Sequence, residues 1–218
     1  LPFQFLPLHA ELLLGCALCN DGVISGGSRI GDPTELALLD LAAKYRMERE
    51  KLEREYPRID EKAFDSDRKM MTTLHRGRGG RVSYTKGSTE EVLRCSKYLL
   101  SRGKKTALTE AARREILHAA GQMSSEALRV LAVAVREEAA APEERELTFV
   151  GLAGMIDPAR PEAAEAVEAF RCAGVDTVMI TGDHIDTAYA IAKELGIAHG
   201  REECLAGSEL DKLDEGQF

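Results

Sequence analysis

Several polar residues that could take part in chemistry lie where predicted strands end. Asp157 follows the predicted strand Thr148–Ile156, and Gly182-Asp183 follows the predicted strand Asp176–Thr181. Parallel α/β sheets place their ligands at the carboxyl ends of strands. Asp157 and Thr181-Gly182-Asp183 are therefore candidates for a ligand site, although a Thr-Gly-Asp turn by itself is also an ordinary connection from strand to helix.

Two other short motifs have residue types that suit a binding site. The motif Gly31–Glu35 reads Gly-Asp-Pro-Thr-Glu, and Lys86-Gly87 ends a predicted strand. Asp32 is a good helix N-cap and Pro33 suits the first helical position. A lysine offers a compact cation for a phosphate group. Taken alone, each motif is explained as well by local structure as by ligand binding.

Common signatures of nucleotide and hydrolytic sites are absent from the sequence. It contains no P-loop, no Gly-x-Gly-x-x-Gly motif and no nucleophile elbow, and the five histidines lack metal-binding spacing. Cys16 and Cys19 form a single Cys-x-x-Cys without a second pair, a pattern that favours buried thiols over a metal or redox centre. We expect no metal ligands in this chain.

The composition narrows the class of protein. The 218 residues are 44% hydrophobic and carry a net charge of −8. A chain with this net negative charge does not attract the phosphates of nucleic acid. Its odd number of scattered cysteines indicates a reducing compartment. No segment approaches the roughly 20 apolar residues needed to cross a bilayer. Because the sequence opens on Leu1 without a signal peptide, we expect it to be the soluble part of a longer protein.

The first two thirds of the chain predict an antiparallel sheet with packed helices. The turn Gly77–Gly80 joins two strands into a hairpin, the second being Arg81–Lys86. Ser88 and Glu91 form a capping box for the next helix. The expected helices cover 33–56, 88–100 and 109–124, a further strand covers 129–135, and 137–146 is a loop or weak helix.

The last third has a different pattern. A strand at 148–156, a helix at 162–173, a strand at 176–181 and a helix at 186–195 alternate in the order of a parallel α/β sheet. We therefore expect two parts of an α/β protein: residues 1–156 as an antiparallel sheet with helices, and residues 157–218 as a partial Rossmann-like segment.

The order of the motifs is more specific than any motif alone. Gly31–Glu35, Phe64–Lys69 (Phe-Asp-Ser-Asp-Arg-Lys), Lys86–Glu90, Asp157–Arg160 and Thr181–His184 follow one another along the chain. Together they resemble the type II P-type ATPases, the family of calcium and sodium/potassium pumps, from about residue 12 to 198. In its overall residue pattern the sequence is most similar to the calcium pumps of bacteria and of the secretory pathway. The resemblance implies a nucleotide-binding domain at 1–156 and part of a haloacid dehalogenase-type phosphorylation domain at 157–218.

The resemblance also implies roles for individual residues. Phe64 would stack on adenine through its aromatic face, Lys86 would offer a cation in the same pocket, and Glu35 would approach the adenine edge. Arg129 would reach the phosphates. The γ-phosphate and ribose would meet the three residues of the second part, Thr181, Gly182 and Asp183. Other positions would line the pocket or the hinge: Ser66, Met71, Gly87, Asp157 and Arg160.

The sequence departs from the family pattern at two places and lacks two of the family's motifs. The usual Lys-Gly-Ala-Pro-Glu appears as Lys86–Glu90 without the proline, and Leu36 stands where a small residue is common. The Asp-Lys-Thr-Gly-Thr motif with the phosphorylated aspartate is absent, as is the Gly-Asp-Gly loop that holds Mg²⁺. We expect those motifs, and the rest of the Mg²⁺ site, outside this sequence, so that the chain binds ATP without hydrolysing it.

The function implied is that of the cytoplasmic, ATP-presenting portion of a cation pump in a bacterial plasma membrane. Its partners would be ATP and the remaining phosphorylation, actuator and transmembrane domains, and calcium is the expected ion although its ligands would lie in membrane helices. A stand-alone nucleotide sensor is the alternative. A soluble haloacid dehalogenase-type phosphatase would not account for Phe64 or Lys86, and soft-metal pumps lack the Lys-Gly and Phe-Asp-Ser signatures.

Overall fold

The computed structural model describes residues 6–77, 79–126, 128–156, 159–181 and 185–210. The chain divides into two compact units. The first unit contains Leu1–Ala120 and Val130–Met155, and the second contains Gly121–Arg129 and Ile156–Phe218.

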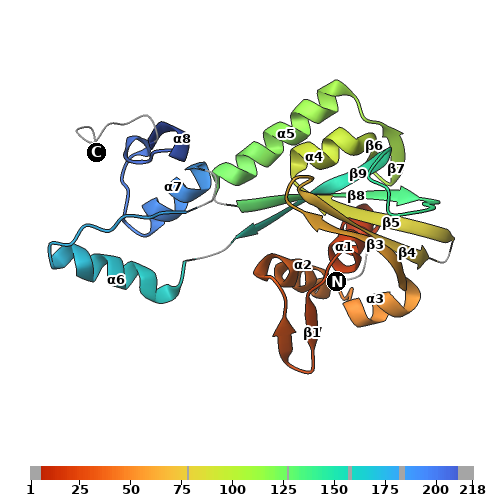
Figure 1. Ribbon diagram of the computed structural model, residues 1–218, viewed down its shortest axis with the longest axis horizontal. Coiled ribbons are helices and arrows are strands. Elements are labelled where there is room, and N and C mark those ends of the chain that lie inside the picture. Colours follow the sequence, from red (N-terminus) through yellow and green to blue (C-terminus); the bar gives the residue numbers. More distant parts are fainter. Residues whose placement is uncertain (1–5, 78, 127, 157–158, 182–184, 211–218) are drawn as a thin grey trace. The chain divides into compact units, whose positions relative to one another are not determined.

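A mixed sheet forms the centre of the first unit (Figure 1). Its strand order is β3-β4-β5-β8-β9-β6-β7. Strands β3, β4, β5 and β8 pair antiparallel in succession, as do β6 and β7, whereas β6 pairs in parallel with β9. The bounds are β3 Arg58–Asp65, β4 Met70–Gly77, β5 Gly80–Gly87, β6 Ser96–Ser101, β7 Lys104–Ala107, β8 Leu128–Glu137 and β9 Leu147–Ile156. The predicted hairpin is confirmed as β4–β5, with Gly77 opposite Gly80.

Helices cover both faces of this sheet (Figure 1). On one face lie α1 (Leu6–Leu18), α2 (Pro33–Lys44) and α3 (Arg49–Glu55), and on the other lie α4 (Thr89–Cys95) and α5 (Glu110–Ser125). A small ribbon of β1 (Val23–Ser25) and β2 (Ser28–Ile30) precedes α2. The predicted class, an α/β unit with a largely antiparallel sheet and packed helices, is therefore confirmed for this unit.

The alternation of side chains along β8 explains how one strand serves both helix layers. Ala132 and Ala134 belong to the hydrophobic cluster with α4 and α5, whereas Val133 and Val135 pack toward α1. Successive residues of a strand point to opposite faces. Gly15 of α1 allows the close approach on that side, because a Cβ there would lie 2.4 Å from Val133 Cγ1.

Two predicted helices end earlier than expected. The helix predicted over 33–56 is divided into α2 and α3, because Arg46 takes a left-handed conformation (φ 62°) and Met47 N–H donates to Ala42 O at 3.0 Å. The break allows Met47 and Leu52 to pack on the cluster of Ala17, Leu39 and Ala42. The helix predicted over 88–100 ends at Cys95, because the next residues form β6 and pair with β9.

From α6 (Pro161–Cys172) onward, the described residues of the second unit form helices and no strand. After α6 come α7 (Ile185–Glu194), the 3₁₀ turn Arg201–Glu203 and α8 (Gly207–Leu210). The predicted helices at 162–173 and 186–195 are confirmed. The predicted strand Asp176–Thr181 is wrong, since these residues have no regular structure and Ile180 is 93% exposed.

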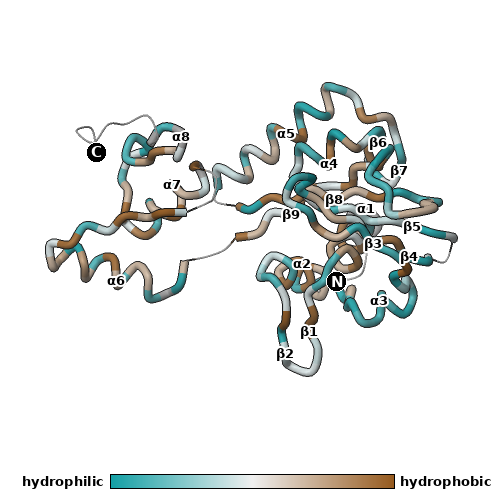
Figure 2. Tube along the Cα trace, viewed as in Figure 1, coloured by the Kyte–Doolittle hydropathy of each residue, from teal (hydrophilic) through white to brown (hydrophobic). Residues whose placement is uncertain are grey.

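The predicted strand at 176–181 is absent because the described residues offer it no strand with which to pair. The segment before Thr181 is strongly hydrophobic (Figure 2), but no strand among the described residues pairs with it. An apolar strand is stabilised by hydrogen bonds to neighbours and by burial on both faces, and residue type alone supplies neither. The other predicted strand of this pattern, Thr148–Ile156, is present as β9 and belongs to the sheet of the first unit.

His75 predicts a pH dependence of folding. Its ring is buried in β4, where Nδ1–H donates to Tyr56 O at 2.9 Å and Nε2 lies 2.8 Å from Thr73 Oγ1. Desolvation lowers the pKa of this imidazole below its usual 6.5. The unfolded chain therefore binds the proton first, and the stability contributed by neutral His75 is complete above about pH 6.5 and falls as the pH drops toward the folded pKa.

We expect His75→Gln to lose less stability than the parent chain when the pH is lowered from about 7.5 to about 5.5. Urea denaturation at both pH values measures this difference. His118→Gln, which changes an exposed histidine of α5, is the matched control and should follow the parent. An unchanged pH dependence in His75→Gln would contradict the assignment.

Candidate functional site

Three neighbouring strands bring Phe64, Met71 and Lys86 to one end of the first unit's sheet. Asp65 pairs with Met70, and Met71 pairs with Lys86. The ladder between β3 and β4 shifts register between Lys62 and Asp65. Successive side chains of a strand point to opposite faces, and Asp65 shares a face with its partner Met70. Phe64, one residue earlier, therefore lies on the face that carries Met71 and Lys86. The irregularity in β3 therefore determines which face the aromatic residue occupies.

Glu35 and Lys86 form a buried ion pair at this end of the sheet. Lys86 Nζ donates to Glu35 Oε1 at 2.6 Å, and the side chains are only 5% and 17% exposed. The second carboxylate oxygen, Oε2, accepts from Asp21 N–H at 3.0 Å. Asp32 caps α2 as predicted, with Thr34 N–H donating to Asp32 Oδ1 at 2.8 Å. The cap fixes the first turn of α2, from which Glu35 reaches Lys86.

The structure adds Asn20 to the site, a residue that the sequence motifs missed. Its side chain is fully buried, and Nδ2 donates to Cys16 O at 3.0 Å and to Glu35 O at 2.9 Å. Its Oδ1 accepts from Gly22 N–H at 2.8 Å. Asn20 thereby ties the end of α1 to the start of α2. An Asn-Asp-Gly turn signal was present in the sequence, but it indicates a turn and not this role.

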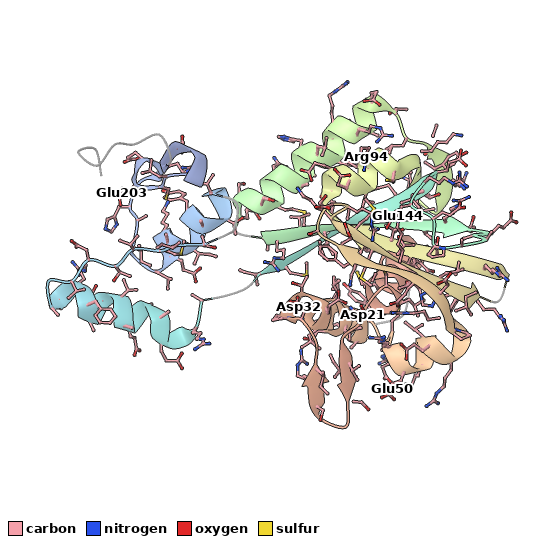
Figure 3. The ribbon with its side chains drawn as sticks, viewed as in Figure 1. Asp21, Asp32, Glu50, Arg94, Glu144 and Glu203 are labelled. Atoms are coloured by element: carbon pink, nitrogen blue, oxygen red, sulfur yellow. The ribbon has the colours of Figure 1, made fainter. Side chains whose placement is uncertain are left out.

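Arg58 of β3 holds the same turn from the other side. It donates to Leu18 O at 3.1 Å and to Asn20 O, and it pairs with Asp21 Oδ1 at 2.8 Å. Figure 3 shows Asp21 and Asp32 on the α1–α2 side of the sheet. The backbone around Glu35 is thus held by contacts from α1, α2 and β3.

The predicted pocket residues differ sharply in exposure. Phe64 is 64% exposed, and Ser66 is exposed in the turn after β3. Met71, in contrast, is 2% exposed and packs with Leu18 and Tyr84 in the core. The structure thus corrects the expected place of Met71: its side chain supports the sheet beneath the site and does not line an open pocket.

Gly87 permits a close approach of two strands. A Cβ at this position would lie 2.4 Å from Lys69 O and 2.7 Å from Met70 Cα. Ser88 N–H donates to Lys69 O at 2.9 Å, and Ser88 Oγ accepts from Glu91 N–H at 3.4 Å as the cap of α4. The Ser88 cap is confirmed, but the other half of the predicted capping box is not formed, because Ser88 N–H donates to Lys69 O and the Glu91 carboxylate pairs with Arg94. Glycine here holds the strand end that carries Lys86 against the loop that follows Phe64.

The other predicted site residues belong to the second unit. Arg129 is exposed at the start of β8, Arg160 precedes α6 at its N-cap position, and Thr181 is exposed outside regular structure. Asp157, Gly182 and Asp183 lie outside the described residues.

The cysteine pair lies in the core of the first unit. Cys16 and Cys19 are both fully buried, and all five cysteines of the chain are free thiols. Burial raises the pKa of Cys16 to about 12 and also raises that of Cys19. These thiols are therefore protonated packing residues.

The described part of the chain contains neither a candidate metal centre nor a candidate membrane-spanning helix. No group of three or more His, Cys, Asp or Glu side chains in that part of the chain is arranged to hold a metal ion. No helix among the same residues has the length and apolar character needed to cross a bilayer.

The geometry of the first unit suits binding more than covalent chemistry. Phe64 presents an aromatic face to solvent, and Lys86 provides a cation whose charge Glu35 balances. An exposed ring can stack on a planar aromatic group. Phe64 has no nucleophilic atom, and the Lys86 ammonium and Glu35 carboxylate are engaged with each other as an ion pair, an arrangement that suits holding a ligand.

Comparison with known proteins identifies the family. Residues 9–162 match the family model described as P-type ATPase, cytoplasmic domain N. Calcium-transporting ATPase 1 of Bacillus cereus is 46% identical over 209 residues, covering 94% of this chain and 24% of that protein. Cation-transporting ATPase pma1 of Synechocystis is 44% identical over 206 residues (88% and 22%). Calcium-transporting ATPase type 2C member 1 of Bos taurus is 39% identical over 208 residues (94% and 21%).

The chain thus spans about a quarter of the length of these curated relatives. The family match covers well over half of the chain and contains Glu35, Phe64 and Lys86. The resemblance inferred from the ordered motifs is confirmed: the chain belongs to the P-type ATPases and contains their cytoplasmic domain N.

Proposed function

We propose that the first unit binds ATP as the nucleotide-binding part of a cation pump. Phe64 stacks on the adenine ring, and Lys86 and Glu35 form the polar floor beside it. The observation that carries this proposal is the exposed Phe64 on the same sheet face as the buried Lys86–Glu35 pair, in a chain of the domain N family. Ser66 and Gly87 contribute the turn and the close strand contact that frame the pocket.

The residues fit the two ends of a nucleotide unequally. The residues suit the adenine end, because stacking on adenine would remove part of the largely exposed, apolar ring of Phe64 from water. The phosphate end finds one cation already paired with a carboxylate, so its attraction for phosphate is weak. ATP supplies Mg²⁺ with phosphate oxygens, and we propose that protein residues outside this chain complete the Mg²⁺ site.

The finer parts of the function are proposals from the family. The parent pump would hydrolyse ATP and pass its γ-phosphate to an aspartate, with calcium as the transported ion because relatives are named calcium-transporting ATPases. Its other partners would be the phosphorylation, actuator and transmembrane domains, in a bacterial plasma membrane.

We further propose that residues 157–218 form part of a haloacid dehalogenase-type phosphorylation domain. There Thr181, Gly182 and Asp183 would meet the γ-phosphate and ribose, with Asp157 and Arg160 near the hinge, and Arg129 of β8 would reach the phosphates. Similarity to pump proteins along 94% of the chain favours this assignment over a stand-alone sensor.

ATP titration of the 218-residue chain by calorimetry tests the proposed site. We expect a dissociation constant on the order of 0.1 to a few mM, equivalent to about −4 to −5 kcal/mol. Phe64→Ala should weaken binding by about 1–3 kcal/mol through the loss of base stacking.

The matched control for this titration is Phe170→Ala, which removes a 52% exposed phenylalanine from α6. It should leave the affinity unchanged. If Phe64→Ala binds ATP as tightly as the parent chain while its circular dichroism is unchanged, the pocket is misassigned.

A further inference from the structure

Phe64 lies near the end of β3, and residues 62–69, from this strand end through the turn that follows it, are called the Phe64 loop here. The ladder from β3 to β4 is irregular between Lys62 and Asp65, and residues 66–69 form a turn. Within the turn, Asp65 Oδ1 accepts from Asp67 N–H and from Arg68 N–H, both at 3.0 Å. These bonds are local and shape the turn, whose last residue is tied to the end of β5 by Ser88 N–H donating to Lys69 O at 2.9 Å.

Glu144 adds a side-chain anchor from a distant part of the chain. This residue lies in the loop between β8 and β9, and its side chain is only 7% exposed. Its carboxylate accepts from Lys62 Nζ at 2.6 Å and from Arg68 Nη1, and Thr72 Oγ1 lies 3.4 Å away. Arg68 Nη2 donates in turn to Ala63 O at 2.6 Å. One carboxylate therefore holds residues on both sides of Phe64, and Figure 3 shows it near α4.

The charges around Glu144 indicate that its loss would loosen the loop and leave the fold intact. A buried carboxylate needs charged partners, and here two cations provide them. Those cations are themselves 45% and 27% exposed, so water can solvate Lys62 and Arg68 when the carboxylate is absent. A cavity of about 400 Å³ that adjoins Glu144, Arg68 and Cys95 gives the released side chains room to move.

We propose that Glu144 is a positioning residue for nucleotide recognition, which holds the Phe64 loop in the conformation that presents the ring. This inference rests on the proposed ATP site. Glu144 would act on the nucleotide indirectly, through the loop. Its carboxylate binds residues on the α4 side of the sheet, whereas Phe64 lies on the opposite face of β3. A binding group that is loosely held loses affinity even when all its atoms are present.

A double-mutant cycle in the 218-residue chain tests the proposal. Glu144→Gln keeps the size of the side chain and removes its charge, and we expect it to raise the dissociation constant for ATP about threefold or more. In the Phe64→Ala background the same change should have no further effect, since the ring it positions is gone. Glu143→Gln is the matched control, because Glu143 pairs with Arg136 and Arg145 and does not contact the loop.

A second measurement needs no nucleotide. Amide hydrogen exchange at Asp67 and Arg68 should accelerate in Glu144→Gln and stay unchanged in Glu143→Gln, because only the first releases the turn. A purely stabilising role would instead speed exchange throughout the unit and lower affinity equally in both backgrounds.

The outcomes separate the two proposals. If Phe64→Ala leaves ATP affinity unchanged, the proposed ATP site fails, whatever Glu144→Gln does. If Phe64→Ala weakens binding but Glu144→Gln does not, or if its effect is the same with and without Phe64, the positioning role of Glu144 is refuted while the site stands.

Discussion

Replacing Glu35 by leucine is expected to lower the free energy of unfolding by about 3–5 kcal/mol, the usual cost of leaving one member of a buried ion pair without its partner. The Lys86 ammonium is 5% exposed and its bond to Glu35 Oε1 is 2.6 Å long, so no water can replace the carboxylate without opening the site. The variant also removes the acceptor of Asp21 N–H. Urea denaturation at neutral pH measures the loss.

The same experiment carries two controls. The double variant Glu35→Leu/Lys86→Met removes both charges and should recover most of the lost stability, because well-packed apolar side chains often replace a buried pair without cost. Asp40 lies on α2 like Glu35, and Asp40→Leu breaks its ion pair with Arg29 of β2. Both partners of this pair are about half exposed, so little change is expected. Equal losses in Glu35→Leu and Asp40→Leu would show that burial of the Lys86 pair is unimportant.

Gly87→Ala is expected to destabilise the first unit by about 3 kcal/mol, the upper end of the usual cost of overpacking. The added Cβ would lie 2.4 Å from Lys69 O and 2.7 Å from Met70 Cα, which are backbone atoms that cannot rotate away. Either β4 and β5 separate or Lys86 is displaced, so ATP binding should weaken along with stability. Thermal unfolding and the ATP titration described above measure both effects.

Gly121→Ala provides the opposite result in the same assay. Gly121 is exposed in α5, and a Cβ there would meet no atom within 4 Å. Alanine at this helical position should stabilise the chain by about 0.5–1 kcal/mol. If Gly87→Ala proves as harmless as Gly121→Ala, the close contact between β4 and β5 is not a constraint on the fold.

Local signals in the sequence were sufficient for several elements of the first unit. The Asp32 cap with Pro33 predicted the start of α2, the glycines at 77–80 predicted the β4–β5 hairpin, and Ser88 predicted the start of α4. These signals work because caps and turns are decided by groups within a few residues of one another. The ordered motifs also identified the family, because the order of motifs along a sequence can be recognised without knowing how the chain packs.

Elements that depend on distant partners were not predictable in this way. The start of β6 requires β9, whose pairing residue Leu147 is far along the chain from Ser96. The apolar segment before Thr181 reads as a strand, yet without a pairing strand among the described residues it forms none. In the first case hydrogen bonds to a remote segment override the local preference, and in the second the local preference is not enough without such bonds.

By itself, then, the sequence determined the family, the helix starts, the hairpin and the choice of Glu35, Phe64 and Lys86 as candidates. Only the tertiary structure decided how they are used. It paired Lys86 with Glu35, buried Met71, and held the Phe64 loop through Glu144. The physical reason is that burial and long-range charge pairing depend on which segments the fold brings together, and the spacing of residues along the chain carries no record of those distances.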